Sequence, residues 1–567
     1  MSVSADAAPA PADKAGGLIA VVGAGTMGRG IAQLALQSGL TVVIIDANPA
    51  ALADAVSSLS ELFETLAGKG RLRETPDQLL SRLTTSHEME AAATARWVIE
   101  AVPEDLELKR LLFSQLAVAA PTARLATNTS TLSVTAIAAG CSRPQDVIGL
   151  HFFNPPGLMR LVEVVPGVAT RSALVSEAMA FVELLGREPV VATDSPGFIV
   201  NRLARPYYLE ALRLHAEGVS VADCDAAMRA AGFPMGPFEL LDLIGLDVNL
   251  ASSISVYRAF FEEPRYRPHP LQQRMVAAGR LGRKTGEGFY RYDEHGKRVG
   301  APSTVDPTSA AVEGHSEPEP GFHVIGTGVL AATLRAHLPA ATEGRRPAVT
   351  FDTRLSADAV RDPGPQRGDL VATLAWARSA ASAASGSPTQ EDPASRPAPA
   401  VLGFSFVPGK QQPERLTIEL LVPAAAGAAD AARQAAAALS SAGVTVITLP
   451  DQPGGVAFRI VALLVNEAVG ALAEGLAQPS AIDLAMRLGV NYPLGPLEWA
   501  ERLGLSTMLR ALDSLHEETG AERFAPHPLL RRLVALGHES FAAHGAPPVG
   551  GSAVPAQDST LSDTMRR

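Results

Sequence analysis

Polar side chains that could carry out acid–base chemistry lie close to three short apolar runs in the first third of the chain. Ser130 follows the run 125–127, His151 follows the run 147–150, and Glu163 lies inside the run 161–165. A carboxylate within an apolar run is costly to bury unless it has a partner, and His151 is the nearest candidate. Such a pair can act as a general base, because the carboxylate orients the imidazole and stabilises its protonated form. Considered singly, His151 could instead be a structural histidine, and Glu163 a solvent-facing acid at a strand edge.

A glycine-rich turn upstream of these residues could hold a dinucleotide. Gly23, Gly25 and Gly28 have the spacing G-x-G-x-x-G, with Thr26 and Met27 inside it, and the turn separates an apolar run from a helical pattern. The glycines allow a tight turn, the approach of backbone N–H groups to a pyrophosphate, and close packing of helix on strand. The motif by itself is weak evidence, since an ordinary glycine turn also matches it.

An acid at the end of the next apolar run supports the nucleotide hypothesis. Asp46 follows the run 41–45, at about the 20-residue separation expected of an acid that binds the ribose hydroxyls and repels a 2′-phosphate. NAD is therefore favoured over NADP. Removal of a hydride from an alcohol carbon also requires a base for the hydroxyl proton, and the pair His151 and Glu163 could provide it. The sequence thus points to an NAD-dependent alcohol dehydrogenase.

The elements that must position these residues form an α/β pattern followed by a helical one. Short apolar runs alternate with helical stretches up to about residue 195, as in an open sheet covered by helices. From Pro196 to about Tyr257 the pattern is helical, with a break at 232–237. We therefore expect a disordered tail over 1–17, a Rossmann-like α/β domain over 18–195 and an all-helical domain over 196–293.

Both patterns return later in the chain in a weaker form. The segment that begins at Asp225 recurs at Asp483, and an apolar run at 322 enters a turn with Gly326 and Gly328 but no third glycine. The glycine turns are 303 residues apart and the helical repeats 258, so the second α/β unit is 45 residues shorter than the first. We predict a linker over 294–320, a truncated degenerate Rossmann-like domain over 321–450, a second helical domain over 451–545 and a disordered tail over 546–567.

Composition argues against several classes of protein. A formal net charge of −11 does not favour nucleic-acid binding, which needs clustered cations. The only cysteines, Cys141 and Cys224, argue against disulfide scaffolding and a cysteine-based metal site, and no metal is expected. No apolar run reaches the ~20 residues that cross a bilayer, and 456–477 should be a buried amphipathic helix. Residues 1–17 lack the features of a signal peptide. We expect a cytoplasmic protein with no nucleic-acid or membrane partner.

Five ordered motifs resemble one family, the L-3-hydroxyacyl-CoA dehydrogenases. They occur in the family's order and spacing over about residues 18–293. The motifs are Gly23-Ala24-Gly25-Thr26-Met27-Gly28, Asn128-Thr129-Ser130, His151-Phe152-Phe153-Asn154-Pro155, Asp194-Ser195-Pro196-Gly197-Phe198-Ile199-Val200-Asn201-Arg202 and Gly282-Arg283-Lys284-Thr285-Gly286-Glu287-Gly288. Because five motifs coincide, the resemblance is far more specific than the glycine turn alone.

The resemblance implies a catalytic role for four residues. His151 would take the proton of the 3-hydroxyl while a hydride passes from C3 of an acyl-CoA substrate to NAD, and Glu163 would orient His151. Ser130 would hydrogen-bond the reacting oxygen. Asn201, from the helical domain, would help to hold the thioester and the histidine. The active site would thus lie in the cleft between the two domains.

The resemblance also implies binding roles for residues outside this group. Asp46, Glu104, Lys109 and Asn128 match positions that contact NAD, and Lys69 matches a basic residue that contacts coenzyme A. The lysines carry little signal of their own, because an isolated lysine is usually only solvated. Their assignment rests on the resemblance.

The second copy lacks the catalytic side chains. Alignment of the two copies places Ser405 where the first has His151 and Phe458 where it has Asn201, although Arg459 still matches Arg202. We expect the second half to be catalytically silent and NAD binding there to be lost. Single-copy members of the family pair through their helical domains. The second helical domain could therefore take the partner's place, giving an intrachain pseudo-dimer, and further homo-oligomers are possible.

The tandem arrangement is most similar to members of the family that act on 3-hydroxyadipyl-CoA in phenylacetate breakdown. That substrate ends in a carboxylate, so a cation near the acyl tail is expected, and Arg202 and Arg205 lie one helical turn apart beside Asn201. The alternative substrate is 3-hydroxybutyryl-CoA of short-chain fatty-acid metabolism. An alternative of another class is a non-catalytic NAD-binding structural protein, which would not need Ser130, His151, Glu163 and Asn201 together.

Overall fold

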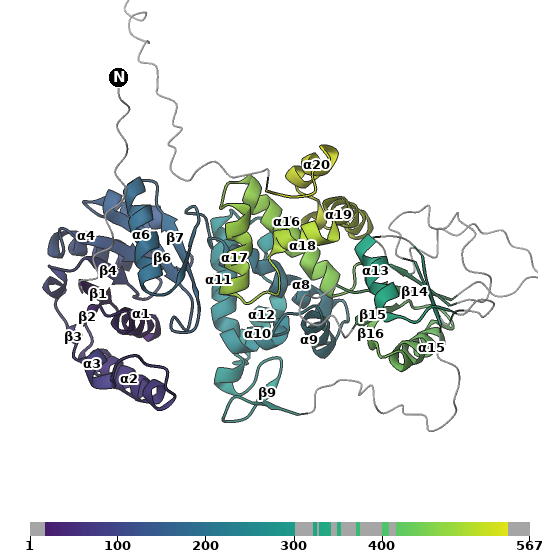
Figure 1. The fold of residues 1–567 in the computed structure, drawn as a ribbon, viewed down its shortest axis with the longest axis horizontal. Coiled ribbons are helices and arrows are strands. Elements are labelled where there is room, and N and C mark those ends of the chain that lie inside the picture. The colour runs from purple at the N-terminus through teal and green to yellow at the C-terminus, as the bar shows by residue number, and fades with distance from the viewer. Residues whose placement is uncertain are drawn as a thin grey trace, which may run out of the picture.

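The computed structural model describes residues 17–300 and 416–542, together with 321–325, 328–341, 347, 349–352, 370–374 and 400–407. In this part of the chain two α/β units flank a central block of helices (Figure 1). Gly326 and the predicted tails over 1–16 and 546–567 lie outside the described residues, as does the linker from 301 to 320. The described chain continues past residue 293 in a short hairpin of β9 (Arg291–Tyr292) and β10 (Arg298–Val299).

The first α/β unit is an eight-stranded sheet in the order β3-β2-β1-β4-β5-β6-β7-β8. All neighbouring strands are parallel except β6 and β7, which are antiparallel. The central strands are apolar on both faces, because helices cover both. The strands are β1 Leu18–Val22, β2 Thr41–Ile45, β3 Leu83–Ser86, β4 Trp97–Glu100, β5 Arg124–Thr127, β6 Val147–Phe152, β7 Leu161–Pro166 and β8 Glu188–Val191.

Two groups of helices cover this sheet. The buried side chains of α1 (Thr26–Gln37), α2 (Pro49–Gly68), α3 (Pro76–Leu80) and α6 (Ser172–Leu184) form one core with one face of the sheet. Those of α4 (Leu106–Ala119) and α5 (Val134–Ala138) join a second core. This is the predicted Rossmann-like architecture, in which ligands bind at the carboxyl ends of the parallel strands.

Two sets of helices form the central block. The first set is α7 Val200–Leu203, α8 Arg205–Ala216, α9 Val221–Ala230, α10 Pro237–Ile244, α11 Leu246–Ala259 and α12 Pro270–Ala277. The second set is α16 Ala457–Ala473, α17 Pro479–Gly489, α18 Pro496–Leu503, α19 Leu505–Thr519 and α20 Pro528–Ala535. The two sets follow the same order, as the sequence repeat predicts.

The second α/β unit is a six-stranded sheet in the order β11-β12-β13-β14-β15-β16. Among its described strands the one antiparallel pair, β14 with β15, corresponds to β6 with β7, so β11 corresponds to β1. In the described part of this unit no strand lies beyond β11, where the first sheet has β2 and β3. Its elements are β11 Phe322–Ile325, α13 Gly328–His337, β12 Val349–Asp352, β13 Leu370–Leu374, β14 Ala400–Ser405, β15 Thr417–Val422, α15 Ala428–Ser441 and β16 Thr445–Pro450.

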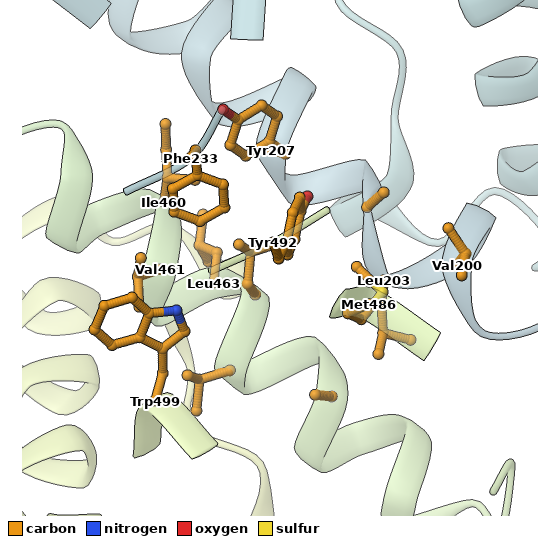
Figure 2. Packing of buried hydrophobic residues seen from close by; sticks show 14 of the residues in the cluster. Val200, Leu203, Tyr207, Phe233, Ile460, Val461, Leu463, Met486, Tyr492 and Trp499 are labelled. Atoms are coloured by element: carbon orange, nitrogen blue, oxygen red, sulfur yellow. The ribbon is translucent and has the colours of Figure 1, made fainter. Parts of the chain in front are cut away.

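The helical sets pack directly on one another. Tyr492 of the second set lies against Tyr207 and Phe233 of the first, with ring centroids 5.5 Å and 4.8 Å apart (Figure 2). Arg202 is fully buried and bonds to Glu467 and Glu474 across this contact. One apolar core therefore extends through both helical sets.

The reciprocal ion pairs lie on the other side of the same contact. Arg459 is buried and bonds to Glu210 and Glu217, as Arg202 bonds to Glu467 and Glu474. Each of these residues in the second set lies 257 positions after its equivalent in the first. The contact between the two helical sets is thus self-complementary, as in a two-fold interface.

The helix α16 is buried on nearly every side. Burial was expected from the sequence, and α8, α17, α18 and α20 pack around α16. Among the described residues no single helix is long and apolar enough to cross a membrane. The helices α10 and α11 together have the necessary length and hydropathy, but the chain bends by 98° between them.

Candidate active site

His151 lies at the centre of a hydrogen-bonded group at the end of β6. Its Nδ1 is 2.6 Å from Glu163 Oε2, and its Nε2 is 3.1 Å from Ser130 Oγ. The imidazole is buried against Phe153 and Phe198, at centroid distances of 4.5 Å and 5.8 Å. With Nδ1–H donated to the carboxylate, Nε2 is the atom that can accept a proton from a hydroxyl group.

Glu163 is brought to His151 by the direction of β7. Because β7 runs antiparallel to β6, His151 and Glu163 occupy paired positions in the register. The other carboxylate oxygen, Oε1, accepts the backbone N–H groups of Ile199 and Val200 at 2.9 Å and 3.0 Å. These groups begin the helical domain at α7, so one buried carboxylate orients the histidine and joins the sheet to the helices. Glu163 is not the solvent-facing acid of the alternative interpretation.

Ser130 and Asn201 complete the group from two different domains. Ser130 comes from the loop after β5, and its backbone carbonyl accepts a hydrogen bond from Asn201 Nδ2 at 3.3 Å. Asn201 lies in α7, directly after the N–H groups that Glu163 binds. The four residues predicted to be catalytic therefore converge where the sheet meets the helical domain.

The glycine turn between β1 and α1 has room for a pyrophosphate. Gly23 has φ +111°, and a Cβ there would lie 2.7 Å from the Ala101 carbonyl oxygen, while a Cβ on Gly28 would lie 1.8 Å from that of Gly23. A Cβ on Gly25 would meet nothing within 4 Å. Gly25 is the N-cap of α1, whose first turn, with Thr26 and Met27, carries no acid and receives no side-chain cap. The N–H groups at this helix start suit an anion such as a dinucleotide phosphate.

Asp46 holds the turn in place from the end of β2. Its Oδ2 accepts the N–H of Ala24 at 2.8 Å, and its Oδ1 accepts that of Asn48 at 2.9 Å. The carboxylate is partly exposed beside the glycine turn. An acid at this place binds ribose hydroxyls and repels a 2′-phosphate, so the pocket suits NAD better than NADP.

Lys109 is not the solvated side chain that an isolated lysine suggests. It is buried, and its Nζ lies 2.5 Å from Glu100 Oε1 and 3.4 Å from Glu104 Oε2. Glu100 also accepts the hydroxyl of Thr127 at 2.6 Å and the N–H of Val102 at 2.8 Å. Glu100 was not predicted as a site residue, although an acid inside the apolar run 97–101 is the same signal that identified Glu163.

Glu104 and Asn128 shape the loop that carries Ser130. Glu104 Oε1 accepts the N–H groups of Ser130 and Thr131 at 2.9 Å and 3.0 Å and the hydroxyl of Thr129 at 2.7 Å. Burial would raise the pKa of Glu104, but the Lys109 ammonium and these hydrogen bonds hold that pKa below its usual range. Asn128 Oδ1 accepts the N–H of Phe152 at 2.8 Å and so ties this loop to β6.

Other predicted binding residues lie outside this group. Lys69 is exposed at the end of α2 and takes no part in the hydrogen bonds around His151. Arg202 is neutralised by Glu467 and Glu474, which leaves Arg205 as the remaining cation beside Asn201. Among the described residues no group of three or more histidine, cysteine, aspartate or glutamate side chains could hold a metal ion.

Comparisons with known proteins match both halves of the helical block. Residues 18–195 match the NAD binding domain of 3-hydroxyacyl-CoA dehydrogenase, and residues 197–292 and 454–543 match its C-terminal domain. The 3-hydroxyadipyl-CoA dehydrogenase of Escherichia coli K12 is 38% identical over 92% of this chain and 98% of its own. A probable 3-hydroxybutyryl-CoA dehydrogenase of Deinococcus radiodurans is 39% identical over 48% of this chain and 99% of its own.

A solved structure resembles the whole arrangement. The crystal structure of a 3-hydroxybutyryl-CoA dehydrogenase from Escherichia coli K12 has a TM-score of 0.73 and 37% sequence identity, covering 92% of this chain and 98% of that one. The similarity therefore extends through both copies of the fold.

Proposed function

Because the chain belongs to the 3-hydroxyacyl-CoA dehydrogenase family, we propose that it oxidises (3S)-3-hydroxyadipyl-CoA to 3-oxoadipyl-CoA with NAD. The observation that carries the reaction is His151 held between Glu163 and Ser130, with Asn201 beside them. A non-catalytic NAD-binding protein would need the glycine turn and Asp46 but not this group.

The site residues divide the reaction between them. The glycine turn and Asp46 would hold NAD, which would supply the acceptor for the hydride that leaves C3 of the substrate. His151 Nε2 takes the proton of the 3-hydroxyl, and Glu163 keeps Nδ1 protonated and stabilises the imidazolium that forms. Ser130 Oγ, 3.1 Å from Nε2, hydrogen-bonds the same substrate oxygen, and Asn201 holds the thioester end. Lys69 is proposed to contact coenzyme A outside this group.

The choice of a dicarboxylic substrate rests on the relative that matches both copies. That relative is named for 3-hydroxyadipyl-CoA and aligns over 92% of the chain. The competing substrate is 3-hydroxybutyryl-CoA, because the solved structure with the same coverage of this chain is named for it. The two substrates differ in their acyl tails, so rates with both decide between them.

The test is the initial rate of NADH oxidation with 3-oxoadipyl-CoA, acetoacetyl-CoA and 3-oxohexanoyl-CoA. We expect kcat/KM to be highest for 3-oxoadipyl-CoA, and His151→Ala to lower kcat by about 10³-fold, as loss of a general base does. Ser405→Ala, at the matching position of the second copy, is the control and should retain the rate. A preference for acetoacetyl-CoA would assign the short-chain substrate, and no rate with any thioester would support the non-catalytic alternative.

We also propose that the second helical set takes the place of a partner subunit, which makes the chain an intrachain pseudo-dimer. The reciprocal pairs of Arg202 with Glu467 and of Arg459 with Glu210 support this, because a two-fold interface repeats each contact. Covalent linkage gives the contact a high effective concentration. Sedimentation of the intact chain should show an active monomer, and activity confined to a larger oligomer would contradict the proposal.

A further inference from the structure

Arg205 is a buried cation that has no anionic partner among the described residues. It follows Asn201 by one helical turn, and its Nε donates to the Asn201 carbonyl oxygen at 2.8 Å. Its Nη1 donates to Ser253 Oγ at 2.9 Å, and the side chain is 4% exposed. No ion pair among the described residues includes Arg205. Burial lowers its pKa, and of its neighbours only Tyr208 and Tyr492 act in the opposite direction. Leaving a guanidinium buried and unpaired is costly, which calls for an explanation.

A chain of hydrogen-bonded polar residues extends from this cation through Ser253. Ser253, which accepts from Arg205, donates to the Asn249 carbonyl oxygen at 2.8 Å, and Gln272 Nε2 donates to Asn249 Oδ1 at 2.8 Å. Gln272 Oε1 is buried and has no hydrogen-bond partner among the described residues. The hydroxyl of Tyr492, from the second copy, is likewise buried without a partner. Buried polar atoms of this kind are normally paired.

The second copy has lost this polar group as a unit. Alignment of the repeats places Ala462, Met508, Leu512 and Leu530 where the first copy has Arg205, Asn249, Ser253 and Gln272. All four of these equivalents lie in the second helical set. The ion pairs at the contact between the copies survive, since Arg459 and Glu467 match Arg202 and Glu210. The second copy therefore lacks this polar group, just as it lacks equivalents of His151 and Asn201. It keeps the ion pairs at the contact between the copies.

The joint absence of the polar group and the catalytic residues from the second copy, and the position of Arg205 beside Asn201, favour a role for this group in the reaction. In a 3-hydroxyadipyl chain the terminal carboxyl carbon is three bonds beyond C3, about 4 Å when extended. Asn201 and Ser130 lie at the reacting end, and Arg205 follows Asn201 by one helical turn, with its Nε 2.8 Å from the Asn201 carbonyl oxygen. We propose that Arg205, supported by Ser253, binds the terminal carboxylate of the substrate and so selects dicarboxylic acyl chains. This inference rests on the proposed function and names the residue that gives it its substrate class.

The test compares two thioesters of equal chain length that differ only in the terminal group. Rates of NADH oxidation are measured on the full chain with 3-oxoadipyl-CoA and 3-oxohexanoyl-CoA for wild type, Arg205→Met and Arg205→Lys. We expect the ratio of the two kcat/KM values to fall at least 50-fold in Arg205→Met and less in Arg205→Lys, which keeps a cation. Arg258→Met, which removes an exposed arginine from α11, is the control and should keep the wild-type ratio.

Each result decides one question. If wild type prefers the adipyl thioester and Arg205→Met, folded by circular dichroism, keeps that preference, then the assignment of Arg205 is wrong while the proposed function stands. A loss equal for both thioesters would make Arg205 structural and would also overturn the assignment. If wild type shows no preference for the carboxylated chain, the proposed substrate fails first and the assignment falls with it.

Discussion

The two copies of the fold differ at the position where the first holds its base. In the first sheet His151 of β6 is opposite Glu163 of β7, and in the second Ser405 of β14 occupies the same register position opposite Glu419 of β15. Both glutamates are buried. Each also accepts two backbone N–H groups at the start of the helical segment that follows. The second copy has lost the base and kept its carboxylate.

This difference separates two tasks that the first copy combines. Glu163 orients His151 and also binds the N–H groups that begin α7, and Glu419 retains only the second task, at Val456 and Ala457. The junction between sheet and helices therefore requires the carboxylate whether or not chemistry takes place. The histidine has no such structural task, so a serine can replace it in the second copy. A retained acid without its histidine is thus evidence of a retained fold, not of a retained activity.

The largest expected effect comes from making the first site like the second. His151→Ser should lower kcat by about 10³-fold or more, because no acid–base group then exchanges the proton of the substrate oxygen in either direction of the reaction. Initial rates of NADH oxidation with 3-oxoadipyl-CoA measure it. The reverse change, Ser405→His added to His151→Ser, should not restore the rate, since Phe458 replaces Asn201 and the second sheet has no equivalent of β2 among the described strands. Recovery in that double variant would show that the second copy had lost only its base.

A second comparison concerns the matched ion pairs between the copies. Arg202→Met should lower the free energy of unfolding by about 3–5 kcal/mol, because Glu467 is left buried with the hydroxyl of Tyr266 and one partly exposed arginine, Arg265, at 3.6 Å. Arg459→Met should cost less, since Glu210 keeps its bonds to two other arginines. Urea unfolding followed by circular dichroism measures both.

An exposed ion pair in the second unit is the control for these variants. Arg433 and Asp430 are both exposed, so Arg433→Met should change the free energy of unfolding by less than about 1 kcal/mol. If Arg202→Met were as harmless as Arg433→Met, the buried pairs would not hold the two copies together.

A further expected effect, smaller than the loss of the buried ion pair, is a pH dependence that belongs to the second copy. Burial raises the pKa of Glu419 to about 7 from an ordinary value of 4.5, against the opposing effect of the Val456 and Ala457 N–H groups. A raised pKa in the folded state means that stability is fully present below pH 4.5 and is lost as the pH rises through 7. The loss attributable to Glu419 is about 3 kcal/mol.

Urea unfolding at pH 5.5 and pH 8 tests this prediction. Wild type should be more stable at the lower pH, and Glu419→Met should show a smaller difference between the two. Some dependence should remain, because burial also raises the pKa of Asp483 to about 7. Equal differences in wild type and variant would mean that Glu419 is ionised in the folded protein throughout this range.

Much of the candidate site could be predicted from short stretches of sequence. The glycine turn, Asp46 and the sequence of motifs indicated an NAD-binding α/β domain, because each depends on neighbours within one or two elements. The tandem repeat likewise indicated a second helical domain, which matches the same family model as the first. The burial of Lys109 could not be predicted from its neighbours in sequence, since it depends on Glu100 in a neighbouring strand.

The sequence by itself determined the chemistry available to this protein, since residue types and local spacing decide which strands, turns and acid–base groups can form. The tertiary structure alone decided which groups meet. The antiparallel direction of β7 brings Glu163 opposite His151, where a parallel strand would have placed it elsewhere along the sheet. Packing between copies neutralises Arg202 through Glu467, 265 residues away, and leaves Arg205 unpaired beside Asn201. Strand direction and contacts between distant segments depend on how whole elements pack, and no local pattern encodes them.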